Sequence, residues 1–146
     1  MIRPISKQDY KEYITMATDF YNSEAVLHSI PQNHIETTFT EITTSNQYVE
    51  GYIFEYDEKI AGYALIAKTF SQEAGGIVIW IEELYVKEDY RNNGLGKAFF
   101  EFIDEKAKTT AIRLRLEVEE DNEKAIALYE KMGFRRLNYL QMYKGK

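Results

Sequence analysis

Residues 91–96 read Arg91-Asn92-Asn93-Gly94-Leu95-Gly96 and join two strongly apolar segments of the chain. The segment before them, residues 77–86, has the pattern of a buried β-strand, and the segment after them, residues 95–103, has that of a helix. A strand that turns through glycines into a helix presents several unpaired backbone N–H groups at one point, and the helix dipole adds partial positive charge there. The stretch therefore predicts an α/β fold with an anion site, suited to a pyrophosphate, at the start of this helix.

The spacing of the two glycines separates this turn from other phosphate-binding loops. A dinucleotide-binding turn reads G-x-G-x-x-G and a P-loop reads G-x-x-x-x-G-K-[ST], and neither pattern is present. The order here is a basic residue, two spacers and then Gly94-x-Gly96. Taken alone, a G-x-G turn is more typical of an ordinary tight connection with Arg91 in solvent.

A second motif follows at residues 122–134, after a strand-like run at residues 112–118. Asn122 is a natural helix N-cap and Gly133 a natural stop. Residues seven apart on a helix lie on nearly the same line, so Asn122 and Tyr129 are expected to point the same way. A separate apolar stripe is expected to face the core; it consists of Ala125, Leu128 and Met132.

Together the two motifs resemble the GNAT superfamily of acyl-CoA-dependent N-acetyltransferases. The family signature R/Q-x-x-G-x-G/A is matched by residues 91–96, and the pattern N-x-x-A-x-x-x-Y-x-x-x-G-F by residues 122–134. The resemblance is specific from about residue 84 to residue 134. The chain is somewhat similar to the diamine and polyamine acetyltransferase branch, and the resemblance implies acetyl-CoA as co-substrate.

The remaining pattern predicts a single α/β (α+β) domain over residues 1–146, with a mixed sheet of about six to seven strands and about four helices. Strands are expected at residues 2–5, 49–56, 60–69, 77–86, 112–118, 134–138 and 140–144. Short turns at residues 57–59 and 71–76 join the second, third and fourth of these strands. The first helix is expected to start at Ser6 and Asp9 and to run to about Tyr21. Further helices are expected at about residues 34–44, from 95, and from 122.

Composition excludes several classes. At 146 residues, with 45% hydrophobic and 29% charged residues, the chain has enough apolar content for one globular core. The absence of cysteine excludes disulfides and a cysteine nucleophile, and the two histidines lack a metal-ligand pattern, so no metal is expected. A net charge of −6 argues against nucleic acid, and no run is apolar enough for a signal peptide or membrane span, so a cytoplasmic location is expected.

Two adjacent carboxylates, Glu82 and Glu83, interrupt the apolar strand at residues 77–86. An amine with a pKa of about 10.4 arrives protonated near neutral pH and needs a base before it attacks a thioester. Adjacent strand residues point to opposite faces, although a bulge can exchange them. The resemblance to polyamine acetyltransferases favours Glu82 as base, with Glu83 as alternative. Either carboxylate can instead pair with Arg113 or Arg115 on the neighbouring strand.

The resemblance implies roles for further residues. Tyr129 matches the tyrosine proposed to protonate the departing CoA thiolate, and Asn122 is expected to hydrogen-bond the pantetheine amide. The backbone of residues 84–86 is expected to pair with the pantetheine arm and to supply the oxyanion donor. The expected cofactor-binding residues are Leu84, Tyr85, Val86, Arg91, Asn92, Asn93, Gly94, Leu95, Gly96, Lys97, Asn122 and Tyr129.

The acceptor is less constrained. From Asp19 to Glu58 there is no Lys or Arg but there are eight acidic residues, which favours a cationic amine if this span borders the acceptor cleft. The same span is also typical of a solvated acidic surface. Its aromatic residues either line a pocket or, more ordinarily, pack in the core; they include Phe20, Tyr21, Tyr48 and Tyr52.

Three functional classes follow. The first is direct acetyl transfer, in a ternary complex, to a small cationic amine or to a protein lysine or N-terminus. The second is a regulatory module that binds CoA without transfer. The third, an unrelated nucleotide-binding α/β protein, is disfavoured by the missing phosphate-loop patterns. A homodimer is possible through apolar residues near the end of the chain, which could equally complete a monomer core: Leu137, Tyr139, Leu140 and Met142.

Overall fold

The computed structural model describes residues 1–146, which form two compact units, residues 1–116 and residues 117–146. The first unit contains the whole sheet and three of the four α-helices. The second unit contains one helix and the C-terminal segment. The α/β class with a mixed sheet and four helices is confirmed.

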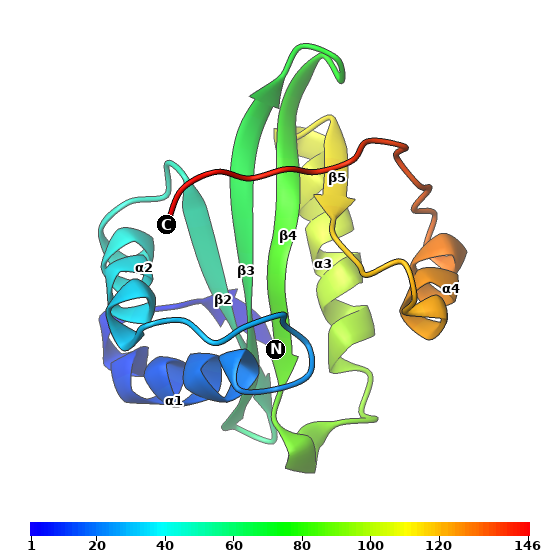
Figure 1. The fold of residues 1–146 in the computed structure, drawn as a ribbon. Helices are drawn as coiled ribbons and strands as arrows, with labels where there is room; N and C mark the ends of the chain where they lie inside the picture. The colour runs from blue at the N-terminus through cyan, green and yellow to red at the C-terminus, as the bar shows by residue number, and fades with distance from the viewer. The chain divides into compact units, whose positions relative to one another are not determined.

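A five-stranded sheet forms the centre of the first unit (Figure 1). The strands follow the chain order across the sheet, and neighbours are antiparallel except the last pair, which is parallel. They are β1 (Ile2–Pro4), β2 (Val49–Tyr56), β3 (Lys59–Ser71), β4 (Gly76–Val86) and β5 (Arg113–Leu116). The parallel pair requires a crossover, which the helix between β4 and β5 provides.

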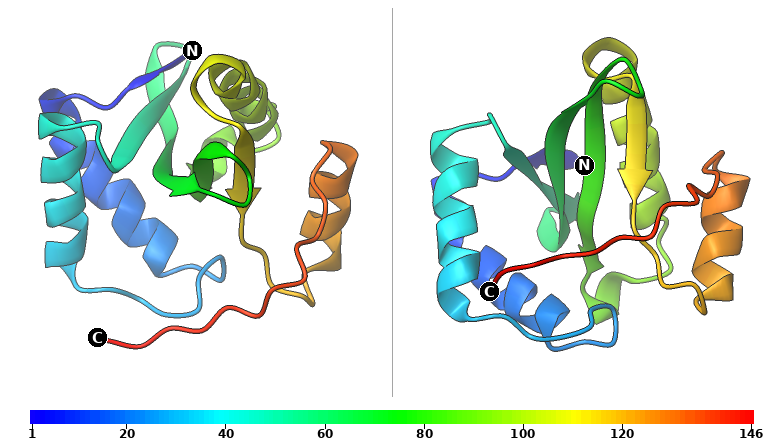
Figure 2. Two further views of the ribbon diagram at one scale, coloured as in Figure 1. Left: turned by 90° about the horizontal axis from the view of Figure 1, so that it is seen from above. Right: turned by 45° about the horizontal axis from the view of Figure 1, so that its top comes forward.

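Three helices cover the two faces of this sheet, as the view from above in Figure 2 shows. α1 (Tyr10–Tyr21) and α2 (Gln32–Thr44) lie on one face, and α3 (Leu95–Thr110) lies on the other. α2 begins two residues before the expected start, directly after Pro31. Short 3-10 turns precede α1 at Lys7–Asp9 and α3 at Glu88–Tyr90.

The core has an aromatic centre on each face. Beneath α1 and α2, Tyr13 packs against Tyr63 and Phe39, with ring centroids 5.3 and 5.5 Å apart. On the α3 face, Phe54 and Phe99 are fully buried with ring centroids 5.6 Å apart. Burial of such side chains provides the main driving force for holding the helices on the sheet.

The second unit departs from the expected pattern. It contains α4 (Glu123–Lys131), but the expected strands at residues 134–138 and 140–144 are not formed, so the sheet has five strands rather than six or seven. Alternating apolar residues indicate a strand only where a partner strand accepts their backbone hydrogen bonds. Leu140 and Met142 are 89% and 88% exposed.

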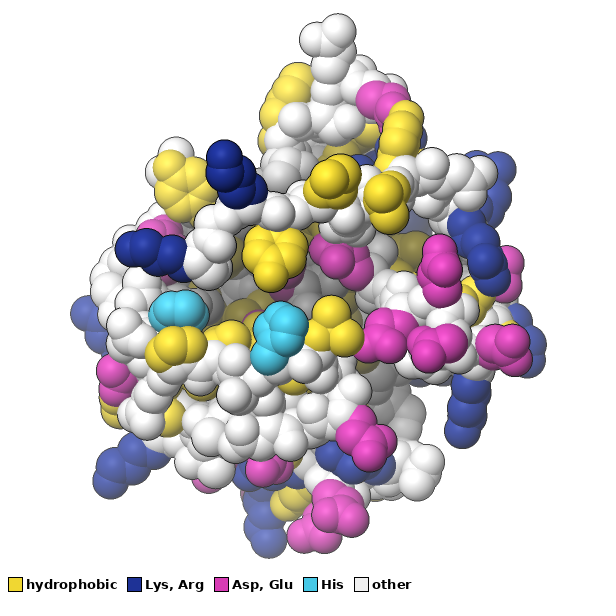
Figure 3. All heavy atoms as spheres, in the orientation of Figure 1, with side chains coloured by type: hydrophobic (Ala, Val, Ile, Leu, Met, Phe, Trp, Pro, Cys, Tyr) yellow, Lys and Arg dark blue, Asp and Glu magenta, His cyan; other side chains and the backbone are white.

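No helix of the chain combines the length and the apolar content needed to cross a bilayer. Both histidines, His28 and His34, are exposed, on the face drawn in Figure 3. No group of three or more metal-ligating side chains is close enough together to hold an ion.

Candidate active site

The turn after β4 leads directly into a helix, as its glycines predicted. Asn92 and Gly94 have φ angles of 66° and 76°, in the left-handed region, and α3 starts at the next residue. The turn is braced by side chains, since Arg91 Nε donates to the Val86 carbonyl at 2.9 Å and Asn93 Nδ2 to the Tyr90 carbonyl at 2.9 Å. The chain therefore reverses into the helix through a preformed loop.

The N-terminus of α3 has no side-chain cap. The carbonyl of Gly94 accepts from the N–H of Ala98 at 2.9 Å, so the N–H groups of Leu95, Gly96 and Lys97 precede the first helical hydrogen bond. A Cβ on Gly94 would have no heavy atom within 4 Å, so the space around the turn is open. Exposed N–H groups and the helix dipole together suit an anion.

The two parallel strands part before they reach this turn. β5 pairs with β4 only from Val78 to Ile81, whereas β4 continues to Val86 paired with β3. Strand backbone presents alternate N–H and C=O groups to each side. Residues 84–86 of β4 therefore present backbone groups along an edge that β5 does not pair.

A β-bulge lies where the strands part. Leu65 of β3 pairs with Glu83, but the next residue, Ile66, pairs with Ile81, so Glu82 is the extra residue of β4. The simple alternation of faces expected for Glu82 and Glu83 is therefore interrupted between them. Glu82 is exposed, whereas Glu83 is partly buried.

Glu83 is held by two tyrosines. The Tyr63 hydroxyl donates to Oε1 at 2.7 Å, and the Tyr21 hydroxyl donates to Oε2. Burial raises the pKa of Glu83, and the two hydrogen bonds oppose that rise because they stabilise the ionised form. Burial also raises the pKa of Tyr21, and the charges of Glu83 and Glu82 raise it further, so both carboxylates act on this hydroxyl.

The alternative pairing of Glu83 with an arginine of β5 is wrong. Arg113 contacts Glu73 at 3.4 Å, and the Arg115 guanidinium lies 4.3 Å from the centre of the Trp80 ring. Glu83 faces α1 instead, because its side chain meets hydroxyls from α1 and β3.

A second hydrogen bond joins the last turn of α1 to β4. The Tyr85 hydroxyl donates to Asp19 at 2.5 Å, and burial followed by this hydrogen bond raises the pKa of Tyr85 to about 12. A hollow of about 270 Å³ adjoins this pair; it is lined by Thr15, Met16, Asp19, Tyr85, Lys87, Glu88 and Asp89.

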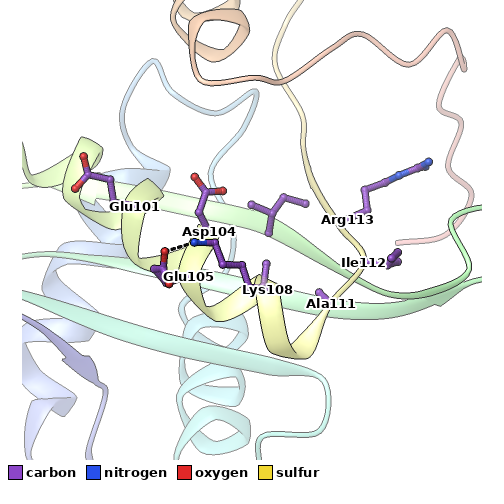
Figure 4. Close-up of a pocket in the computed structure, with 9 residues that line it drawn as sticks. Glu101, Asp104, Glu105, Lys108, Ala111, Ile112 and Arg113 are labelled. Carbon is purple, nitrogen blue, oxygen red and sulfur yellow. Dashed lines mark hydrogen bonds and ion pairs between the residues drawn. The ribbon is translucent and has the colours of Figure 1, made fainter.

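A larger hollow lies elsewhere, along the C-terminal half of α3 and the start of β5 (Figure 4). It has a volume of about 800 Å³, and Glu105 and Lys108 form an ion pair at its wall. Neither the bulge carboxylates nor the turn before α3 lines it, so size alone does not identify the functional site.

The motif helix of the second unit has the expected ends. Asn122 Oδ1 accepts from the N–H of Ala125 at 3.3 Å, and Gly133 has a φ of 97° just after the helix. Tyr129 is partly buried, and burial raises its pKa. The expected apolar stripe is wrong in part, because Leu128 is 54% exposed and the buried residue is Ile126.

Residues 12–134 match the model of the Acetyltransferase (GNAT) family. The chain belongs to this family. Members of the GNAT family use acetyl-CoA, and the assignment supports N-acetyltransferase activity for the chain. The family match does not assign the chain to the diamine and polyamine acetyltransferase branch.

Several known proteins are similar to this GNAT protein. It is 32% identical over 126 residues to the ribosomal protein bS18-alanine N-acetyltransferase of Escherichia coli K12, covering 84% of this chain and 77% of that relative. A possible acetyltransferase from Clostridium difficile 630 has a TM-score of 0.84 at 19% identity, covering 100% and 96% of the two chains. AAC(6')-Iy, in complex with the bisubstrate analogue CoA-S-monomethyl-acetylneamine, has a TM-score of 0.80 at 13% identity, covering 100% and 97%.

Sequence reasoning missed most of the residues around the bulge of this GNAT protein. The sequence singles out Tyr21 only as one of four aromatics of the acidic span and Asp19 only as the first acidic residue of that span, and it does not single out Tyr63. Of those four aromatics, Phe20 and Tyr52 lie in the core, Tyr48 is 60% exposed, and Tyr21 contacts Glu83. No local pattern marks the last contact, because the two residues are 62 positions apart.

Proposed function

We propose that this protein transfers the acetyl group of acetyl-CoA to a primary amine by direct attack within a ternary complex. One observation carries the proposal: β4 parts from β5 at a bulge holding two glutamates and then runs into an uncapped helix N-terminus. A thioester donor needs a backbone edge and an anion site, and an amine acceptor needs a base near both.

The turn and the free edge of β4 fit the donor. The open space at Gly94 and the N–H groups at the start of α3 suit a pyrophosphate, and the edge of β4 suits an amide-containing arm. A backbone N–H at this edge is suited to stabilise the oxyanion. Arg91 Nε is used by the Val86 carbonyl, so its terminal nitrogens and Lys97 would add charge. The proposed donor-binding residues are Leu84, Tyr85, Val86, Arg91, Asn92, Asn93, Gly94, Leu95, Gly96, Lys97, Asn122 and Tyr129.

Glu82 is the better candidate for the base. Both carboxylate oxygens of Glu83 accept tyrosine hydroxyls, whereas Glu82 is exposed at the bulge. When bound, acetyl-CoA supplies the thioester carbonyl. Glu82 takes a proton from the acceptor's ammonium group, directly or through water, and the neutral amine that results forms the new C–N bond as the C–S bond breaks. Glu83 holds the tyrosines beside it.

Tyr129 is the proposed general acid. Its position in the motif of residues 122–134 matches the tyrosine of the family pattern. Burial raises its pKa, so the hydroxyl keeps its proton at neutral pH and can give it to the departing thiolate.

The acceptor is proposed to be a small cationic amine. Asp19 lies in the last turn of α1, which reaches the bulge of β4 through the hydrogen bond from Tyr21 to Glu83. Residues 19–58, which begin with Asp19, contain no Lys or Arg. A protein N-terminus or lysine is the second candidate, because the Escherichia coli relative is named for an alanine of a ribosomal protein. A regulatory module without transfer is less well supported, because it has no need of a base beside the donor site.

The two compact units are proposed to make one acetyltransferase domain. The family match runs from residue 12 to residue 134 and so crosses the boundary at residues 116 and 117. Leu140 and Met142 of the C-terminal segment are exposed apolar residues that would suit an interface between two copies of the chain. Light scattering, which measures the mass of the particle in solution, tests whether the protein is a dimer.

A thiol-release assay with acetyl-CoA tests the function. The acceptor panel contains polyamines, aminoglycosides, an alanine-starting peptide and a lysine peptide. We expect turnover with a cationic amine, and loss of about 100-fold in kcat/KM in Glu82→Gln, the size of a general-base contribution. Glu120→Gln, at another exposed glutamate, is the matched control. No thiol release with any amine, despite binding of acetyl-CoA, would favour the regulatory module.

A further inference from the structure

The Tyr21 hydroxyl has a restricted hydrogen-bonding capacity. It carries one hydrogen, which it donates to Glu83, and an ionised carboxylate can only accept. The oxygen of Tyr21 is therefore left with lone pairs alone. A ligand group that meets this oxygen must bring its own hydrogen.

Tyr21 differs in exposure from the other tyrosine on Glu83. Tyr63 is fully buried, with its ring 5.3 Å from that of Tyr13 in the core. Tyr21 is only partly buried, at the last residue of α1, where the chain leaves the helix. Of the two hydroxyls that hold Glu83, the one on α1 is therefore the one that a ligand can approach.

The surroundings of Tyr21 are acidic. Glu83 accepts its hydrogen, and the charge of Glu82 also acts on it. Asp19 lies two residues earlier on the same turn and accepts from Tyr85. Lone pairs among carboxylates attract a cation that carries N–H groups and repel a carboxylate, phosphate or carbonyl.

The hydroxyl is also fixed in place. The Tyr21 ring packs edge-on against Phe20, with centroids 5.1 Å apart and planes at 84°. The bond between Tyr85 and Asp19 ties the same helical turn to β4. A recognition group held in this way loses little freedom when a ligand binds.

We propose that Tyr21 is a specificity-determining residue that accepts a hydrogen bond from the acceptor's amine or ammonium group. The inference rests on the proposed acyl transfer and states how that site selects its acceptor. The hydrogen bond holds the nitrogen beside Glu82. Tyr21 takes no proton and forms no covalent bond.

The test compares Tyr21→Phe with Tyr63→Phe in the full chain, with the amine that the wild-type protein uses best. Each variant removes one hydroxyl from Glu83, but only the first removes the proposed contact with the acceptor. We expect Tyr21→Phe to raise KM for the amine about tenfold, the size of a hydrogen bond to a charged group. KM for acetyl-CoA should stay within about twofold of the wild-type value. Tyr63→Phe should raise KM for the amine less than about threefold.

A second measurement needs no variant. The trimethylammonium analogue of the same amine keeps the charge but has no N–H, so it should inhibit the wild-type protein with a Ki about tenfold above the Kd of the amine. Equal affinities of the amine and its trimethylammonium analogue would overturn the inference. Equal increases in KM for Tyr21→Phe and Tyr63→Phe would also overturn it, because they would indicate that Tyr21 only supports Glu83. An unchanged KM in active Tyr21→Phe overturns this inference and leaves acyl transfer standing. Absence of turnover in the wild-type protein overturns the transfer itself.

Discussion

The hydroxyl of Tyr21, the last residue of α1, donates a hydrogen bond to Glu83, which lies one residue beyond the extra residue in the bulge of β4. Two residues further along each element, in opposite directions, Tyr85 of β4 donates to Asp19 of α1. The helix end and the strand are thus tied twice at the point where β4 and β5 part. The pair of bonds sets the acidic surroundings in which an acceptor amine is expected to bind.

Replacing the tyrosine of the second motif tests the proposed general acid. In Tyr129→Phe we expect kcat to fall about 100-fold, because the departing thiolate loses its proton donor, while KM for acetyl-CoA stays within about twofold. The measurement is steady-state thiol release. Tyr143→Phe, at a tyrosine that is 87% exposed, controls for loss of a hydroxyl. Turnover equal to wild type would remove Tyr129 from the mechanism.

The two glycines of the turn should respond differently to alanine. A Cβ on Gly96 would lie 3.7 Å from its nearest neighbour, Leu84 Cδ2, so Gly96→Ala should fold with an unchanged or slightly raised Tm. Weaker CoA binding in that variant would then report close approach of the phosphates to the backbone. Gly94 has a φ of 76°, so Gly94→Ala should in addition lose about 1–2 kcal/mol of the free energy of unfolding.

The measurement for both glycine variants is the change in Tm on adding excess CoA, beside urea unfolding without it. Asn92→Ala serves as the control for backbone strain, because Asn92 also has a positive φ, of 66°, so alanine should lower the free energy of unfolding there too, while the backbone N–H proposed to bind CoA is kept. Wild-type CoA affinity in Gly96→Ala would contradict close packing of the phosphates on this turn.

The buried carboxyl of Glu83 should make stability depend on pH. Burial raises its pKa in the folded state above the value of about 4.3 expected in the unfolded chain. Between these two values the folded state holds the proton more strongly, so the free energy of unfolding falls as pH rises, by up to about 1.4 kcal/mol per pH unit. Glu83→Gln cannot titrate and should lack this fall.

Urea unfolding of the wild type and Glu83→Gln between pH 4 and pH 8 isolates the effect. Asp9, whose pKa is lowered mainly by its hydrogen bonds from Arg3, is common to both proteins. Asp9 stabilises the folded state at pH values above the ordinary pKa of aspartate, and this contribution is lost as pH falls. Because both proteins contain Asp9, its contribution cancels when the free energies of unfolding of the wild type and Glu83→Gln are subtracted. If the free energy of unfolding of the wild type rose with pH relative to that of Glu83→Gln, the raised pKa of Glu83 would be contradicted.

Close packing of β3 on β4 near the site should make one glycine indispensable. A Cβ on Gly62 would lie 2.2 Å from the Tyr85 carbonyl oxygen and 3.1 Å from Val86 Cα, both backbone atoms. Gly62→Ala should therefore lower the free energy of unfolding by about 1–3 kcal/mol or more. At Gly76, the first residue of β4, the nearest atom is Ile112 Cγ2 at 3.5 Å, so Gly76→Ala should cost little. Equal unfolding curves for the two variants would contradict this.

The local elements of the site were predictable because short-range patterns specify them. The turn with φ-positive Gly94, the start of α3 and the Asn122 cap of α4 follow from residues within a few positions of each other. The prediction of a strand pair at residues 134–138 and 140–144 was wrong. Alternating apolar residues do not by themselves provide a neighbouring strand to accept the backbone hydrogen bonds.

The sequence by itself determined the family and the glycine turn before α3, since both depend on residue types at fixed spacing over residues 91–96 and 122–134. Only the tertiary structure decided the surroundings of the carboxylates. The bulge at Glu82 depends on the register of β3 against β4, and the contact of Glu83 with Tyr21 joins residues 62 positions apart. Register and long-range contacts arise from packing across the sheet, so no local pattern carries them.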